Sequence, residues 1–231
     1  YAISGFVDGL TDQLERYGLQ LVIRRLKKDV PVGDMWQAIM PAAVLLLDDV
    51  ARTEQALMES SGVFVARGVL WNAEHSDNPV LARGSLVGTL QAEHLLARGH
   101  RRIGYLAPTA EQHQLFSRLR IEGAEGAIRA DGAAPLDIRA ADLTPDSIQD
   151  ALGQWLAAEP EQRISAVCAY SDDYAVALLS AMRTHGLTAP DDIAVIGADN
   201  IPLGLFADPP LSSINHNQDE LVHYLADVLN A

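Results

Sequence analysis

The chain has 231 residues, of which 48% are hydrophobic and 21% charged, the balance of an ordinary folded protein with a sizeable core. Its formal net charge is −14, from 17 Lys and Arg residues against 31 Asp and Glu residues. A surface this acidic repels phosphate backbones, so the composition argues against direct nucleic-acid binding by these residues.

Membrane and disulfide-stabilised classes are also disfavoured. No apolar run approaches the roughly 20 residues that a membrane-spanning helix requires, and the longest, residues 42–47, has the length of a strand. The sequence shows no secretion leader, and the single cysteine, Cys168, excludes an internal disulfide framework. We therefore expect a protein of a reducing compartment, the cytoplasm, without membrane contact.

Helix and strand signals alternate through the first half of the chain. Apolar residues at helical spacing from Ile3 to Tyr17 predict a first helix, and Gly18 follows where a left-handed helix end would lie. The elements predicted next are strands at 19–23 and 42–47, a helix at 51–60, a strand at 63–66, an irregular stretch at 68–79 and a helix at 85–98. Because the chain opens inside a helix, we expect a further strand to precede it.

The second half repeats this alternation. Thr144, followed by Pro145 at the first helical position, is a strong helix start. The predicted elements are strands at 102–107, 136–139, 164–170 and 193–196, and helices at 116–130, from 145 to 156, at 172–185 and at 218–229. Strands separated by helices of this length imply parallel sheets built from right-handed β-α-β units.

Searches for catalytic motifs favour a protein that is not an enzyme. The sequence has no G-x-G-x-x-G at a strand-to-helix junction, no phosphate-binding G-x-x-x-x-G-K-[ST], and no serine centred as in a nucleophile elbow. The histidines lack the spacing of a zinc site. The carboxylate pairs at 172–173 and 191–192 stand at element ends, where aspartates form caps and turns. We expect no cofactor and no metal.

Four segments resemble the effector-binding domain of LacI/GalR-type transcriptional regulators. They are EHLLARGHRRIGYL at 93–106, SRLRIEG at 117–123, AYSDDYA at 169–175, and the stretch 191–214, in which a G-x-D sequence at 197–199 is followed by PPLSSI. The resemblance implies an α/β fold of the type I periplasmic-binding-protein-like kind, with two doubly wound parallel-sheet lobes and a ligand cleft between them. It places the N-terminal lobe at 1–101 plus 216–231 and the C-terminal lobe at 102–215.

The same resemblance implies which residues bind the ligand. Arg120 matches an arginine that reaches into the family's cleft, and a guanidinium offers a planar fork of donors. Asp199 follows a predicted buried strand and would accept hydrogen bonds from ligand hydroxyls. The alternatives are a solvated helix arginine and a turn aspartate.

Four further candidates are less specific. Ser171 stands where the family usually has Asn, and a pure N-cap role explains it almost as well. His216 falls on the family's crossover strand. The aromatic side chains of Trp71 and Phe116 are candidates for a stacking wall or for the core. One departure is Leu86, at a position where the family often has an aspartate.

The resulting hypothesis is the effector-sensing domain of a dimeric cytoplasmic regulator. Its ligand would be a small polar molecule, with sugars favoured over nucleosides and small organic acids. Ligand binding would control operator binding allosterically, through a helix-turn-helix headpiece that is absent from these 231 residues. The alternative is the solute-binding protein of a sugar transporter, which shares the fold, so the fold alone does not decide between the two.

Overall fold

The computed structural model describes residues 2–24, 36–37, 39–46, 52–67, 79–215 and 218–230. The chain divides into two compact units: unit 1 is Tyr1–Leu81 with Asn217–Ala231, and unit 2 is Ala82–His216. None of the helices in the described part of the chain is long and apolar enough to cross a membrane.

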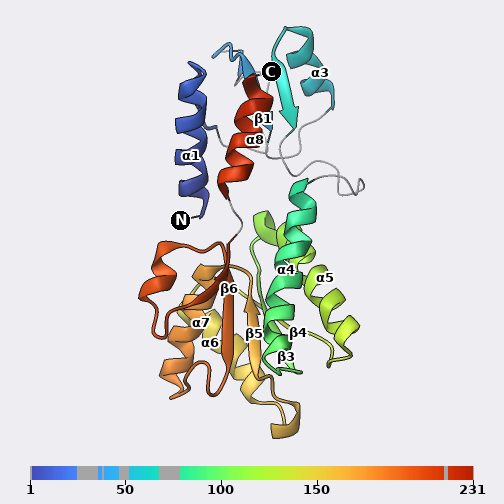
Figure 1. The fold of residues 1–231 in the computed structure, drawn as a ribbon, viewed down its shortest axis with the longest axis vertical. Helices are drawn as coiled ribbons and strands as arrows, with labels where there is room; N and C mark the ends of the chain where they lie inside the picture. Colours follow the sequence, from blue (N-terminus) through green and yellow to red (C-terminus); the bar gives the residue numbers. More distant parts are fainter. Residues whose placement is uncertain are drawn as a thin grey trace. The chain divides into compact units, whose positions relative to one another are not determined.

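Unit 1 joins the two ends of the chain (Figure 1). Its elements are α1 (Ala2–Arg16), β1 (Ala43–Leu46), α3 (Arg52–Ser60), β2 (Phe64–Arg67) and α8 (Gln218–Asn230). Apolar side chains from the first and last helices form one small core: Leu10, Leu14, Val222, Leu225 and Ala226. The strands β1 and β2 pair in parallel, and a second core consists of Trp36, Leu46, Met58 and Val63.

The sequence predicts this unit well except at one strand. The first helix ends as expected, with Gly18 at a positive φ of 74°. The strand predicted at 19–23 is wrong: these residues form no strand, and Val22 and Ile23 are exposed. An apolar run becomes a strand only where a neighbouring strand pairs with its backbone, and in the described part of unit 1 the sheet consists of β1 and β2 alone.

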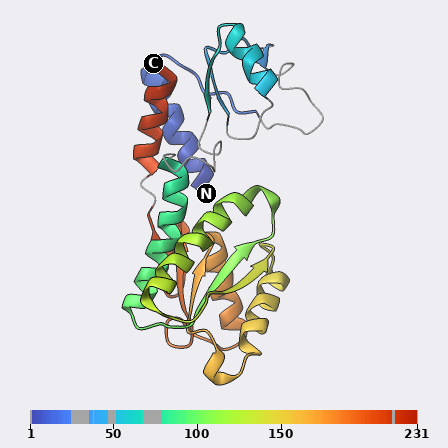
Figure 2. The same ribbon diagram turned by 90° about the vertical axis from the view of Figure 1, so that its right-hand side faces the viewer.

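Unit 2 is a five-stranded parallel sheet covered by helices on both faces (Figures 1 and 2). Its helices are α4 (Pro79–Ala97, in this unit from Ala82), α5 (Gln114–Asp131), α6 (Pro145–Leu156) and α7 (Asp172–Thr184), with short 3-10 turns η1 (Glu111–His113), η2 (Pro160–Gln162) and η3 (Pro202–Phe206). Its strands are β3 (Ile103–Pro108), β4 (Asp137–Ala141), β5 (Ala166–Ala169), β6 (Ala194–Ala198) and β7 (Ser212–Ile214).

The strand order is β4-β3-β5-β6-β7, so the chain winds outward in one direction from β3 and then in the other. This doubly wound order has its switch point between β3 and β5. The α/β parallel-sheet prediction is confirmed, and Thr144 caps α6 as expected by accepting from the Ser147 amide. The three-residue strand β7 was not predicted.

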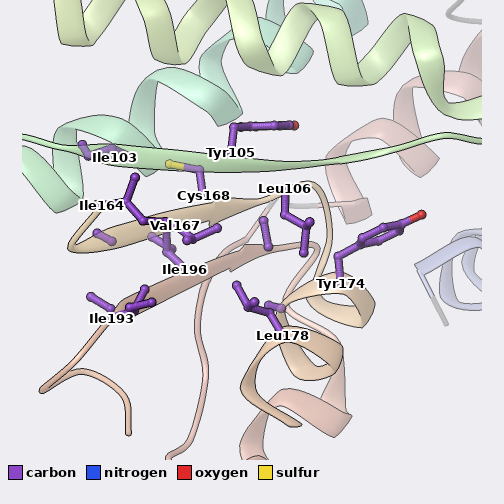
Figure 3. Close-up of a cluster of buried hydrophobic side chains, with 14 of the residues drawn as sticks. Ile103, Tyr105, Leu106, Ile164, Val167, Cys168, Tyr174, Leu178, Ile193 and Ile196 are labelled. Carbon is purple, nitrogen blue, oxygen red and sulfur yellow. The ribbon is translucent and has the colours of Figure 1, made fainter. Parts of the chain in front are cut away.

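The core of unit 2 fills both faces of the sheet, as Figure 3 shows. Tyr105 lies on the face covered by α4 and α5, whereas Leu178 of α7 lies on the other. Cys168 is fully buried within β5, and burial raises the pKa of its thiol. This cysteine is therefore an inert core residue, as the sequence predicts.

Helix α4 contributes to unit 2, whereas the sequence-based division placed residues 82–101 in the N-terminal lobe. Ala92 and Leu95 are buried in the core of unit 2. The amide of Gln91 is fully buried and donates to the carbonyls of Ala169, at 2.9 Å, and Gly197, at 3.0 Å. These contacts bind α4 to the ends of β5 and β6.

Helices α4 and α5 approach each other closely at two glycines. A Cβ added to Gly88 would lie 1.7 Å from the Arg120 carbonyl oxygen, and one added to Gly123 would lie 1.9 Å from that of Ser85. The Thr89 hydroxyl also donates to the Gly123 carbonyl at 3.2 Å. Glycine at these positions therefore sets the separation of the two helices, and with it the place of α5 over the sheet.

We expect Gly123→Ala to lower the free energy of unfolding by about 3 kcal/mol, because the new methyl group forces the helices apart. Gly126→Ala, on the same helix, is the matched control: its Cβ would meet nothing within 4 Å. This control should raise stability by about 0.5–1 kcal/mol, the ordinary gain in a helix interior. Urea denaturation measures both, and equal effects would contradict the close-packing account.

The environment of His100 predicts a pH-dependent stability for unit 2. Its Nδ1 lies 2.9 Å from the Ser165 hydroxyl, and burial together with the Arg98 charge lowers the pKa of the imidazole. The unfolded state therefore binds a proton more readily than the folded state, so stability falls as the pH drops from about 6.5 toward the lowered pKa.

Comparison of the wild type with His100→Asn tests this effect. The Asn amide can replace the contact to Ser165 but does not titrate. The free energy of unfolding of the wild type should fall relative to that of the variant as the pH goes from 7 to 5.5. Parallel curves from denaturation at several pH values would show that His100 carries no such linkage.

Candidate functional site

The candidate site lies at the carboxyl edge of the unit 2 sheet. Parallel strands all end at one edge, and ligands of doubly wound sheets bind there, at the switch point. The residues that directly follow β3, β4, β5 and β6 are Thr109, Asp142, Tyr170 and Asp199. Polar and aromatic side chains are thus brought together from strands far apart in the sequence.

A buried ion pair forms the centre of this edge. The Arg120 Nη2 lies 3.3 Å from the Asp199 Oδ1, and the two side chains are 8% and 14% exposed. The Arg120 Nη1 also donates to the Tyr170 carbonyl, and the guanidinium carbon lies 4.8 Å from the centroid of the Tyr170 ring. Arg120 therefore joins the ends of β5 and β6, and the alternative of a solvated helix arginine is wrong.

Helix α5 holds Arg120 inward because of its sequence spacing. Ser117, Arg120 and Gly123 recur every three residues, and all lie on the buried face of the helix. The glycine lets that face press against α4. The S-x-x-R-x-x-G pattern thus marks the packed face of α5, and it places the Arg120 side chain at the edge of the sheet.

Asp199 occupies an unusual backbone conformation. Its φ is 108° and that of Asn200 is 51°, in a region that L-residues rarely adopt. Such a conformation costs on the order of 1–3 kcal/mol and persists only where the surroundings impose it. Asp199 is therefore a turn residue that is also the partner of Arg120, whereas its role as an acceptor for ligand hydroxyls stays a prediction.

Aromatic rings line the switch point beside the ion pair. The ring centroids of His113 and Tyr170 are 5.5 Å apart, and those of Tyr170 and Tyr174 are 6.0 Å apart in an edge-to-face arrangement. The Tyr170 hydroxyl lies 3.4 Å from the His113 Nδ1. Burial raises the pKa of Tyr170, although the Arg120 charge opposes the shift. Tyr170 and Tyr174 are buried and His113 is half-buried, so the three rings form an aromatic cluster beside the guanidinium against which a sugar or a base could pack.

A second carboxylate, Asp172, lies buried behind the edge. It is only 1% exposed, accepts from the Ile201 amide at 2.8 Å and is bound by the Ser213 hydroxyl at 2.6 Å. Burial raises the pKa of its carboxyl, whereas the two hydrogen bonds oppose that shift. The sequence predicts an ordinary cap or turn at Asp172, whereas the structure gives it partners far along the chain, at Ile201 and Ser213.

The structure places the other predicted ligand-binding residues in different surroundings. Ser171 occupies the N-cap position of α7 in an extended conformation, but its side chain makes no capping hydrogen bond. Phe116 is half-buried and packs against the core of unit 2. Trp71 and His216 lie outside the described residues. Leu86, at the departure from the family pattern, is exposed on α4.

Sequence reasoning missed Tyr170, His113 and Gln91. The signal for Tyr170 was its place directly after a predicted strand, where the edge rule puts ligand-binding residues. Gln91 lies inside a helix pattern that gives no hint of buried polar contacts. Within the described part of the chain, no three His, Cys, Asp or Glu residues form a group that could hold a metal ion.

Comparisons with known proteins agree with this architecture. The family described as "Periplasmic binding protein-like domain" matches residues 92–231. The ribose operon repressor of Escherichia coli strain K12 is 34% identical over 162 residues, which are 69% of this chain and 48% of the repressor. The regulator GntR of Pseudomonas aeruginosa is 34% identical over 195 residues, covering 81% of this chain and 54% of that protein.

A solved structure of a LacI-family regulatory protein from Chloroflexus aggregans shares the fold. It has a TM-score of 0.79 and 20% sequence identity, and the match covers 99% of this chain and 83% of that one. A LacI-family regulator from Enterococcus faecium with bound ribose matches with a TM-score of 0.78 at 18% identity, covering 99% and 84%. The chain spans about half the length of the curated relatives that it matches.

We expect Asp199→Asn to lower the free energy of unfolding by about 3 kcal/mol, because it leaves the buried Arg120 charge uncompensated. Asn tolerates the positive φ, so the backbone effect is small. The control is Asp131→Asn, which removes a partner of Arg101 at 3.4 Å in an exposed pair and should cost less than about 1 kcal/mol. Urea denaturation gives both values; a loss at Asp199 no larger than at Asp131 would refute the buried pair.

Proposed function

The chain belongs to the LacI family of transcriptional regulators, and from this premise we propose that it is the effector-sensing part of such a regulator. It would bind a small polar ligand at the carboxyl edge of unit 2 and thereby change the affinity of the whole protein for operator DNA. A protein that regulates operator DNA would be located in the cytoplasm. The curated relatives that it matches are named as transcriptional repressors and regulators, so neither the transporter alternative nor catalysis is favoured.

The buried pair of Arg120 and Asp199 is the observation that carries this proposal. A guanidinium and a carboxylate held beside the switch point supply donors and an acceptor for ligand hydroxyls. The rings of Tyr170 and His113 add an apolar wall beside them. Hydroxyl-binding groups next to an aromatic surface fit a sugar, and two structural neighbours are described with ribose and with cellobiose.

We also propose Ser171, Phe116, Trp71 and His216 as further contacts of the ligand. Ser171 has support from its place at the end of β5, next to Tyr170. Phe116 lies on α5 directly before Ser117, the first buried residue of that helix. His216 rests on the family resemblance, and Trp71 rests on the capacity of an aromatic face to stack on a sugar or a base.

DNA binding would reside in a helix-turn-helix headpiece outside these 231 residues. The net charge of −14 supports this division, because an acidic domain repels a phosphate backbone. A homodimer is proposed on the same grounds of family, and one structural neighbour is a dimeric Lac repressor. Ligand would act by binding one arrangement of the protein more tightly, with a coupling of about 1–3 kcal/mol.

A thermal-shift screen with pentoses, hexoses, disaccharides, nucleosides and small organic acids tests the proposal. A ligand at about 100 times its Kd should add about 2.7 kcal/mol of stability. Arg120→Met and Asp199→Gly should each lose this shift relative to their own melting temperatures. Glycine suits the positive φ at position 199, and methionine keeps the apolar stem at position 120.

Arg118→Ala is the matched control, since Arg118 is exposed on the same helix. It should keep the full ligand shift. A ligand whose shift survives in both site variants would show that this edge is not the binding site. A panel without any shift would contradict sensing of these ligand classes.

A further inference from the structure

Three successive backbone amides at the end of β6 each have a different partner. The Asp199 N–H donates to the Ile214 carbonyl at 3.0 Å, and the Asn200 N–H donates to the Ser213 hydroxyl at 3.0 Å. The Ile201 N–H donates to the Asp172 carboxylate at 2.8 Å. Amides pinned one after another leave the turn little freedom, which is what the positive φ of Asp199 requires.

Two of those partners are themselves bonded to each other. The Ser213 hydroxyl accepts from the Asn200 amide and donates to the Asp172 Oδ1 at 2.6 Å. Because a hydroxyl has one proton and two lone pairs, Ser213 serves both contacts at once. The carboxylate therefore fixes the Asn200 and Ile201 amides together, one directly and one through Ser213.

Gly197 makes room for this arrangement. A Cβ at position 197 would lie 2.0 Å from the Asp172 Oδ1 and 3.1 Å from the Leu211 side chain. The carboxylate thus occupies the space that any larger residue would take. The G-x-D sequence at 197–199 therefore lies against Asp172 at Gly197 and pairs with Arg120 at Asp199.

We propose that Asp172 is a positioning residue for the ligand-binding edge: through Ser213 and the Ile201 amide it holds Asp199 in the conformation that meets Arg120. This inference rests on the proposed function for its importance to ligand binding. The positioning itself is a property of the unliganded protein. Asp172 does not contact the ligand in this account; it acts through the turn.

The test compares three variants by NMR of the folded protein without ligand. The Nη–H resonances of Arg120 report on the ion pair in the folded protein, because Nη2 is the nitrogen that lies 3.3 Å from the Asp199 Oδ1. Asp172→Asn removes one of two acceptor oxygens, and Ser213→Ala removes the hydroxyl that connects Asp172 to the Asn200 amide. Asp173→Asn is the control, because it removes a neighbouring carboxylate from the same first turn of α7.

The proposal predicts that the Arg120 Nη–H resonances move in Asp172→Asn and Ser213→Ala and stay in place in Asp173→Asn. An unchanged resonance in the folded Ser213→Ala protein would overturn it. Ser213 is half-buried, so its variant carries the test if Asp172→Asn does not fold. Since no ligand is used, failure here is distinct from failure of the ligand screen.

A double-variant cycle gives a second, independent measurement. Ser213→Ala should raise the unfolding equilibrium constant by a factor at least about threefold larger in the wild-type background than in Asp199→Asn, because residues of one network couple. Equal factors in the two backgrounds would show that Ser213 and Asp172 only support the fold, and would overturn the positioning role.

Discussion

The ion pair between Arg120 and Asp199 is the interaction on which the site depends, because a charge with so little exposure is tolerated only with a partner. Arg120 reaches that partner from a helix, and Asp199 reaches it from a turn at the end of a strand. The position of each residue of the pair is therefore set by a different element of the fold. The pair also draws in Tyr170, whose carbonyl accepts from the guanidinium and whose ring lies beneath it.

Three glycines allow the close approaches that hold these polar groups in place. Gly88 and Gly123 let α5 approach α4, which sets how far Arg120 reaches over the sheet. Gly197 admits the Asp172 carboxylate, which pins the turn that carries Asp199. In both cases a missing side chain lets a backbone or a carboxylate approach closely, so substitutions at these glycines should disturb the site.

The fold could be predicted from sequence far better than the site. Alternating patterns predicted the order of helices and parallel strands, and the resemblance singled out Arg120 and Asp199. Asp172 was misread because an aspartate at a helix start is usually a local cap, and nothing local reveals partners at Ile201 and Ser213. The strand predicted at 19–23 failed for the converse reason: an apolar run does not reveal whether a neighbour is available to pair with it.

The most direct test of the account is an NMR titration of the arginine side-chain Nε–H resonances with the ligand identified by the thermal-shift screen. The account predicts that the Arg120 resonance shifts and saturates with the binding curve. Arg101 and Arg163, which precede β3 and β5 at the opposite edge of the sheet, should not move. A saturable shift at those two arginines with Arg120 unchanged would contradict a ligand site at the carboxyl edge.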